Sequence, residues 1–109
     1  MQHQIAEYDE IKRLTYLIVD SVKPQKIYLF GSFVRGEQTE NSDYDFCVIV
    51  DDNIKNTREI ATAAHHAIGL NRKRPIDILA VRNKDFEAEK NLGCSLFGQI
   101  NQKGVIMYE

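Results

Sequence analysis

The sequence predicts one small α/β domain, and three observations support this prediction. Apolar residues recur at helical spacing in several segments, which indicates amphipathic helices. Between these segments lie short runs rich in Ile, Val, Leu and Phe that are typical of strands. The chain has 109 residues, of which 43% are hydrophobic and 28% charged, so it has the size of one globular domain with a single core.

The first expected element is an amphipathic helix that ends before Pro24. Residues 26–30 follow as a short strand. Gly31 then lets the backbone turn sharply, and Ser32 is expected to be the N-cap of a short helix that stops at Gly36. The apolar positions of the first helix are Ile5, Tyr8, Ile11, Leu14 or Thr15, Ile18 and Val22.

The second strand is expected over residues 43–50, after a polar loop at residues 37–42. It is the most apolar of the expected strands, so a central place in the sheet is expected for it. A second helix over residues 56–69 and a third strand over residues 76–81 come next. The remaining expected elements are helices over residues 84–90 and 94–102 and a short last strand over residues 105–108.

The net charge and the two cysteines limit the classes of function that the sequence supports. The formal net charge is -2, whereas proteins that grip the nucleic-acid backbone are usually basic, so direct nucleic-acid binding is not expected. Cys47 and Cys94 have no metal-type spacing, and Cys47 is expected to be a buried free thiol. No signal-peptide pattern and no apolar stretch of membrane-spanning length are seen, which favours a cytoplasmic protein without a membrane contact.

Three aspartates fall on the two most apolar predicted strands. Asp43 and Asp45 are one residue apart, so their side chains share a face and lie ~6.6–7 Å apart at the backbone. Asp77 lies inside the third strand, and all three carboxylates can converge if that strand neighbours the second. At ~5 Å and an effective dielectric of ~20, each pair would repel by ~3 kcal/mol. A fold retains such a cluster with a cation between the acids, or with some of them protonated.

The residue types predict which cation and which chemistry. Oxygen ligands without His or Cys select Mg²⁺ or Mn²⁺, and two such ions ~3.5–4 Å apart support in-line attack at phosphorus. The helix that begins at Ser32 offers free N–H groups and a hydroxyl to phosphates, and Gly31 lets the phosphates come close. Arg35 is expected to contact phosphate or to pair with one of the acids. Each feature alone is common, but their conjunction favours a metal and triphosphate site.

Several other residues are conspicuous in the sequence, and two of these features have two possible interpretations. The basic run at residues 72–74 is either a solvated loop or a contact to nucleotide phosphates or to an acidic partner surface. Tyr44 alternates to the face opposite the acids and is expected in the core or on a partner surface. His65 and His66 are adjacent on a helix and do not easily form a ligand pair, so exposed helix positions are expected.

Together the glycine–serine turn and the acids resemble the signature of the nucleotidyltransferase superfamily that includes DNA polymerase beta. The shared pattern is Gly31-Ser32, a gap of ten residues, Asp43-x-Asp45 and a later strand acid, Asp77. The resemblance implies a small mixed β-sheet backed by helices. It implies that the three aspartates are the metal ligands and catalytic residues for two Mg²⁺ ions, or Mn²⁺ in their place. It also implies that Gly31 and Ser32 grip the triphosphate of ATP.

Further residues are similar to the small prokaryotic branch of that superfamily, the minimal nucleotidyltransferases. Arg35-Gly36, Ser42 before the first acid, and the last six residues all fit this branch, so the resemblance covers nearly the whole chain. Two positions depart from it. Val34 stands where many relatives have alanine, and Phe33 is bulkier than usual, which affects the expected shape of the pocket but not the metal site.

The resemblance also implies a partner and a reaction. Proteins of this branch commonly act beside a small helical partner of the HEPN class, an RNase toxin. The chain would then be the antitoxin, which transfers AMP from ATP to a tyrosine hydroxyl of the toxin. One metal ion would lower the pKa of the attacking hydroxyl, and the other would neutralise the leaving pyrophosphate. Asp77 would help to deprotonate the nucleophile.

Two other functions stay open at this point. One is a binding module that neutralises its partner by contact alone, with the acids vestigial or used only to bind nucleotide. The other is nucleotidyl transfer to a small molecule such as an aminoglycoside, which is disfavoured because 109 residues leave little room to enclose an acceptor. The acceptor surface is expected from another polypeptide, either a partner or a second copy in a homo-oligomer. Intact acids favour the enzyme.

Overall fold

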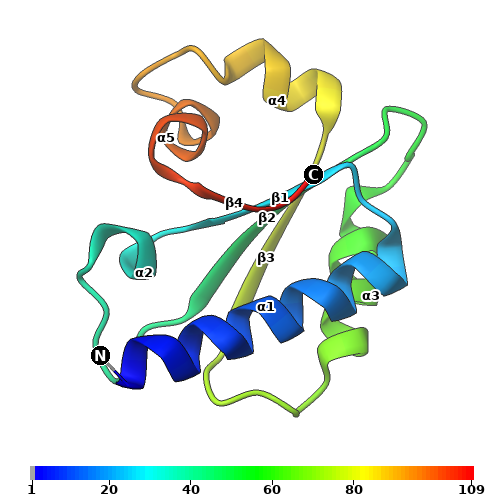
Figure 1. Cartoon of the computed structure of the whole chain (residues 1–109). Helices are drawn as coiled ribbons and strands as arrows, with labels where there is room; N and C mark the ends of the chain where they lie inside the picture. The colour runs from blue at the N-terminus through cyan, green and yellow to red at the C-terminus, as the bar shows by residue number, and fades with distance from the viewer. Residues whose placement is uncertain (1) are drawn as a thin grey trace.

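The structure, a computed structural model, describes residues 2–109, with side chains from Glu7 onward, so the predicted apolar role of Ile5 lies outside the described side chains. A four-stranded sheet runs through the middle of the molecule, and helices cover both of its faces (Figure 1). In chain order the elements are α1 (Gln2–Val22), β1 (Lys26–Phe30), α2 (Ser32–Arg35), β2 (Tyr44–Val50), α3 (Thr57–Ile68), β3 (Ile76–Arg82), α4 (Asn83–Glu89), α5 (Leu96–Lys103) and β4 (Val105–Tyr108).

The sheet is mixed, as the family resemblance implied. The strand order is β3-β2-β1-β4. β1 is antiparallel to β2 and to β4, whereas β2 and β3 are parallel. A parallel pair needs a crossover, and α3 supplies it between β2 and β3. β2 is an inner strand whose residues after Asp45 are all buried, which confirms its predicted central position.

The side-chain alternation of β2 separates two apolar layers. Tyr44 and Phe46 face the layer beneath α1 and α3, and the buried side chain of Tyr44 confirms the core alternative for this residue. Cys47 and Ile49 face the layer beneath α4 and α5, where Cys47 is a buried free thiol as expected. By the same alternation Asp45 lies on the α4–α5 side, at the end of the sheet where β2 begins.

Most predicted boundaries agree with the structure to within one or two residues, but the expected cap of α2 is wrong. Gly31, not Ser32, is the N-cap, with φ 84° and ψ -154°, and Ser32 is the first helical residue. This backbone conformation is open almost solely to glycine, so the turn has to occur at Gly31. Gly36 ends the helix in the left-handed conformation, as predicted. The hydroxyl of Ser32 is thereby placed at the start of α2 without a capping role.

Across residues 2–109, no helix combines the length and apolar character that a membrane crossing requires.

Candidate active site

The sheet brings two of the three predicted acids side by side. Asp45 is directly opposite Asp77 in the parallel register of β2 and β3. Asp43 lies one residue before β2, at the same end of the sheet. The condition on which the predicted convergence depended, that the third strand neighbours the second, is therefore met. It is met because α3 returns the chain to a strand that starts level with β2.

The pKa of Asp45 reflects its position beside the other two acids. Its pKa is raised above the ordinary value near 3.8, chiefly because the carboxyl is partly buried, and further by the negative charges of Asp77 and Asp43. Arg35 acts in the opposite direction. The acids are thus close enough to affect one another electrostatically.

The carboxylates are neighbours without forming a compact ligand group. Among the described residues, no three His, Cys, Asp or Glu side chains lie close enough together to hold a metal ion. Asp43 and Asp77 are exposed, while Asp45 is half-buried. Their donor chemistry is that of a hard-cation site, because all three offer only oxygen atoms.

Gly31 lies directly against Asp45. A Cβ atom built on Gly31 would overlap Oδ2 of Asp45 and stand 3.1 Å from its carboxyl carbon. Since L-residues also rarely adopt the φ of 84° found here, glycine is required for two separate reasons. The glycine–serine turn and the strand that carries Asp45 therefore meet in direct contact.

The short helix α2 carries the predicted phosphate ligands. The backbone N–H groups of Val34 and Arg35 donate to the carbonyl of Gly31 at 3.1 and 3.2 Å. The N–H groups at the very start of a helix have no intrahelical partner, so those beside Ser32 remain free for an anion. Arg35 is half exposed and pairs with Glu37 at 3.3 Å rather than with an aspartate.

A cavity of about 430 Å³ adjoins these residues. Gly31, Arg35 and Asp45 form one wall, and Gln99 and Lys103 of α5 are part of the opposite wall. The sequence analysis did not single out either α5 residue. The local sequence gives no signal for them, because α5 reaches the site through long-range contacts: β4 pairs with β1, where Leu29 lies opposite Val105, and Ile100 packs in the layer that contains Tyr28.

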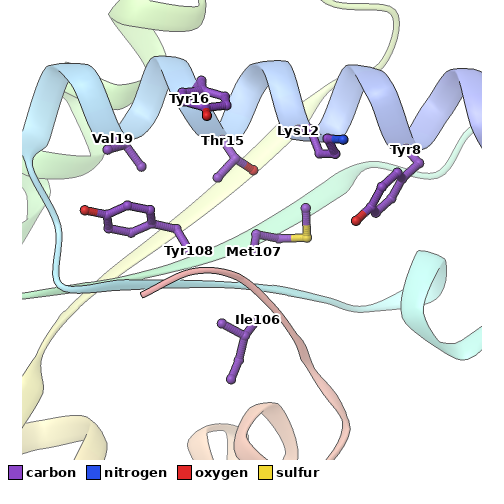
Figure 2. Close-up of a pocket in the computed structure, with 8 residues that line it drawn as sticks. All are labelled: Tyr8, Lys12, Thr15, Tyr16, Val19, Ile106, Met107 and Tyr108. Carbon is purple, nitrogen blue, oxygen red and sulfur yellow. The ribbon is translucent and has the colours of Figure 1, made fainter.

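A second cavity lies away from the acids. It occupies about 330 Å³ between α1 and β4 and contains none of the predicted site residues. Figure 2 shows Tyr8, Tyr16 and Tyr108 around it, with the Met107 side chain pointing toward α1. His65 and His66 also lie apart from the acids, exposed on α3 as expected.

Comparison with known proteins adds a family and several relatives. Residues 12–108 match a family model described as polymerase beta, nucleotidyltransferase. A protein of Methanocaldococcus jannaschii, provisionally named a protein adenylyltransferase, is 48% identical over 50 residues, which is 45% of this chain and 50% of that protein. The match thus spans about half the length of that curated relative.

Two solved structures share the fold. A chain in a crystal structure of a toxin-antitoxin with AMP-PNP superposes with a TM-score of 0.57 at 25% identity, covering 89% of this chain and 72% of that one. A Sulfolobus solfataricus protein, provisionally named a nucleotidyltransferase, superposes with a TM-score of 0.63 at 18% identity, covering 99% and 85%. The second likeness concerns the fold alone.

Proposed function

This chain belongs to the polymerase beta nucleotidyltransferase family, and on that premise we propose that it transfers AMP from ATP to a tyrosine hydroxyl of a partner toxin of the HEPN type. In this role it is an antitoxin that modifies its partner. The observation that carries the proposal is the register of Asp45 with Asp77, against Gly31 and beside a cavity of about 430 Å³. A relative named for protein adenylyl transfer and a toxin-antitoxin neighbour with AMP-PNP support it.

The donor atoms, all carboxylate oxygens, fit a divalent metal in their chemistry, although the three described side chains do not form a compact ligand group. Asp43, Asp45 and Asp77 would hold Mg²⁺, or Mn²⁺ in its place, because carboxylates without His or Cys favour hard cations. The raised pKa of Asp45 supports this fit, since a cation between the acids would relieve the repulsion that contributes to it. A bound pair of ions supplies charge neutralisation for in-line attack at the α-phosphorus.

The residues of the chain have separate roles in the proposed reaction. The Ser32 hydroxyl and the start of α2 bind the outer phosphates, next to the cavity that Gly31, Arg35 and Lys103 line. Asp77 accepts the proton of the attacking tyrosine hydroxyl. The hydroxyl oxygen forms a bond to the α-phosphorus, the bond from that phosphorus to the bridging oxygen breaks, and pyrophosphate leaves.

Labelled ATP tests the proposal. With Mg²⁺ and the partner toxin, label from the α-phosphate is expected on the toxin, and label from the γ-phosphate is not. The double variant Asp43→Asn, Asp45→Asn is the control and should transfer nothing. Label from the γ-phosphate on the toxin would contradict nucleotidyl transfer, and α-label on a free small molecule would identify a different acceptor class.

A neutralising binding module is the second candidate function. It is favoured by one observation, the lack of a compact three-ligand group among the described side chains. In that case the partner would be silenced by contact, and the double aspartate variant would neutralise it as well as the wild type does.

Replacing Asp77 with Asn is expected to reduce transfer by at least about 100-fold, because a general base typically contributes that much or more. Asp77 is exposed, so its loss should leave the thermal unfolding midpoint unchanged or raised. Initial rates of AMP transfer, together with calorimetry of the variant, measure the two effects. A rate close to that of the wild type would remove Asp77 from the mechanism.

Replacing Lys103 with Ala is expected to raise the KM for ATP by about tenfold with a smaller change in kcat. An ionic hydrogen bond to phosphate is worth roughly 1.5–3 kcal/mol, and 1.4 kcal/mol corresponds to a factor of ten. The matched control is Lys90→Ala, since Lys90 lies in the same helical layer and pairs with Glu87 outside the cavity. Equal KM values for the two variants would exclude a contact between Lys103 and the nucleotide.

A further inference from the structure

Arg74 turns inward from the basic loop before β3 and joins the loop that carries the first acid. Its Nη1 atom donates to the backbone carbonyls of Thr39 at 2.7 Å, Glu40 at 3.1 Å and Ser42 at 3.2 Å. Its Nη2 atom donates to the Glu7 carboxylate of α1 at 2.8 Å. Only 17% of the Arg74 side chain is exposed. One guanidinium therefore links α1 and the loop before β3 to the segment that leads into Asp43.

That segment is a closed turn whose carbonyl oxygens converge on Arg74. The N–H of Thr39 donates to the Ser42 hydroxyl at 2.8 Å, and the N–H of Ser42 donates back to the Thr39 carbonyl at 3.1 Å. One residue after Asp43, the N–H of Tyr44 donates to the carbonyl of Pro75 at 3.0 Å. Asp43 thus lies between the turn that Arg74 organises and the backbone hydrogen bond from Tyr44 to Pro75, the residue after Arg74.

The same guanidinium also contacts α2. It lies over the ring of Phe33, 5.0 Å from the ring centroid, and the rings of Phe33 and Tyr44 are 5.0 Å apart. Phe33 directly follows Ser32, the proposed phosphate ligand. Arg74 therefore contacts two parts of the candidate site: the turn before Asp43 and the helix that begins with Ser32.

The geometry argues against a direct contact between Arg74 and nucleotide. Phe33 and Tyr44 belong to the apolar layer beneath α1 and α3, whereas Asp45 lies on the opposite face of the sheet. Both Nη atoms of Arg74 already donate to the carbonyls and to Glu7. Arginine suits this place because its planar fork offers five donors, while lysine offers three from one point.

We propose that Arg74 is a positioning residue, which fixes the turn before Asp43 relative to α2 and so sets the place of Asp43 beside Asp45 and Asp77. The inference rests on the proposed function for its catalytic consequence, but the positioning itself is independent of it. It assigns the predicted basic run a role that differs from a solvated loop and from a phosphate contact.

Hydrogen exchange on the full chain tests the positioning directly. In Arg74→Gln the amides of residues 39–44 are expected to exchange at least about tenfold faster, because charged hydrogen bonds worth more than 1.4 kcal/mol are lost. Amides of β1 and β2 outside this segment should keep their rates. The matched control is Arg82→Gln, since Arg82 also donates to backbone carbonyls, those of Ile54 and Lys55, but does not touch the turn or the loop before β3.

A second measurement reports on the three aspartates themselves. The affinity for Mn²⁺ alone, measured by electron paramagnetic resonance, is expected to fall about tenfold in Arg74→Gln, to recover only in part in Arg74→Lys, and to stay unchanged in Arg82→Gln. In AMP transfer kcat should fall more than the KM for ATP rises. If Arg74→Gln does not fold, Glu7→Gln gives the same comparison, because Glu7 anchors the guanidinium.

The outcomes separate the two proposals. A folded Arg74→Gln with wild-type exchange at residues 39–44 and wild-type Mn²⁺ affinity would overturn the positioning role. Faster exchange in that turn, in a chain whose wild type transfers no AMP, would support the positioning role and contradict the proposed function. Equal losses in Arg82→Gln and Arg74→Gln would also overturn the inference, because they would show a general loss of stability.

Discussion

Replacing Gly31 with alanine is expected to abolish AMP transfer and to destabilise the fold. The positive φ of Gly31 alone makes an L-residue there less stable by about 1–2 kcal/mol. The added methyl group would also overlap Oδ2 of Asp45 and displace the carboxylate from its present place opposite Asp77. Since a displacement of about 1 Å can reduce a rate by 100-fold, a loss of at least about that size is expected.

Gly36→Ala separates these two causes. Gly36 also has a positive φ of 73°, but a Cβ there would meet nothing within 4 Å. The variant should be destabilised by about 1 kcal/mol in denaturant unfolding and should retain transfer. Comparable activity in the two variants would show that the contact between Gly31 and Asp45 does not matter for the site.

Replacing Asp45 with Asn is expected to abolish transfer and yet to stabilise the protein at neutral pH in metal-free buffer. The folded-state pKa of Asp45 is raised, first by burial and then by Asp77 and Asp43, so the folded chain binds this proton more tightly than the unfolded chain does. Ionisation of Asp45 therefore opposes folding. The wild type should lose stability relative to Asp45→Asn as the pH rises from 3.8, the ordinary pKa of this carboxyl, through the raised pKa of Asp45 in the folded chain.

Unfolding of both proteins at several pH values measures this difference. The two curves should coincide below pH 3.8 and separate above it, with Asp45→Asn the more stable. Added Mg²⁺ should raise the melting temperature of the wild type and have a smaller effect on the variant, because binding to the native state adds stability. A less stable variant at neutral pH, without metal, would contradict the electrostatic account of the acids.

The parts of the site that the sequence predicted correctly depend on local rules. The apolar runs located the strands that carry Asp45 and Asp77, and the glycine before Ser32 indicated the turn. The N-cap was assigned one residue too late, because propensity favours serine at that position while the backbone conformation at Gly31 admits almost only glycine.

The parts that sequence reasoning missed depend on partners far along the chain. Lys103 reaches the cavity because β4 pairs with β1, and no local pattern specifies that pairing. The sequence left the basic run that contains Arg74 open between a solvated loop and a contact to phosphates or a partner. The actual bonds of Arg74 go to backbone carbonyls more than thirty residues earlier. Carbonyl groups are present at every position, so a sequence does not reveal which of them an arginine will bind.

Intact-mass spectrometry of the partner toxin tests the central claim most directly. The purified chain is incubated with ATP, Mg²⁺ and the product of the neighbouring gene, alongside the double variant Asp43→Asn, Asp45→Asn. The account predicts that the toxin gains the mass of one or more adenylyl groups with the wild type and none with the variant, and that the modified residue is a tyrosine. An unchanged mass in a stable complex would contradict enzymatic transfer and leave neutralisation by contact as the function.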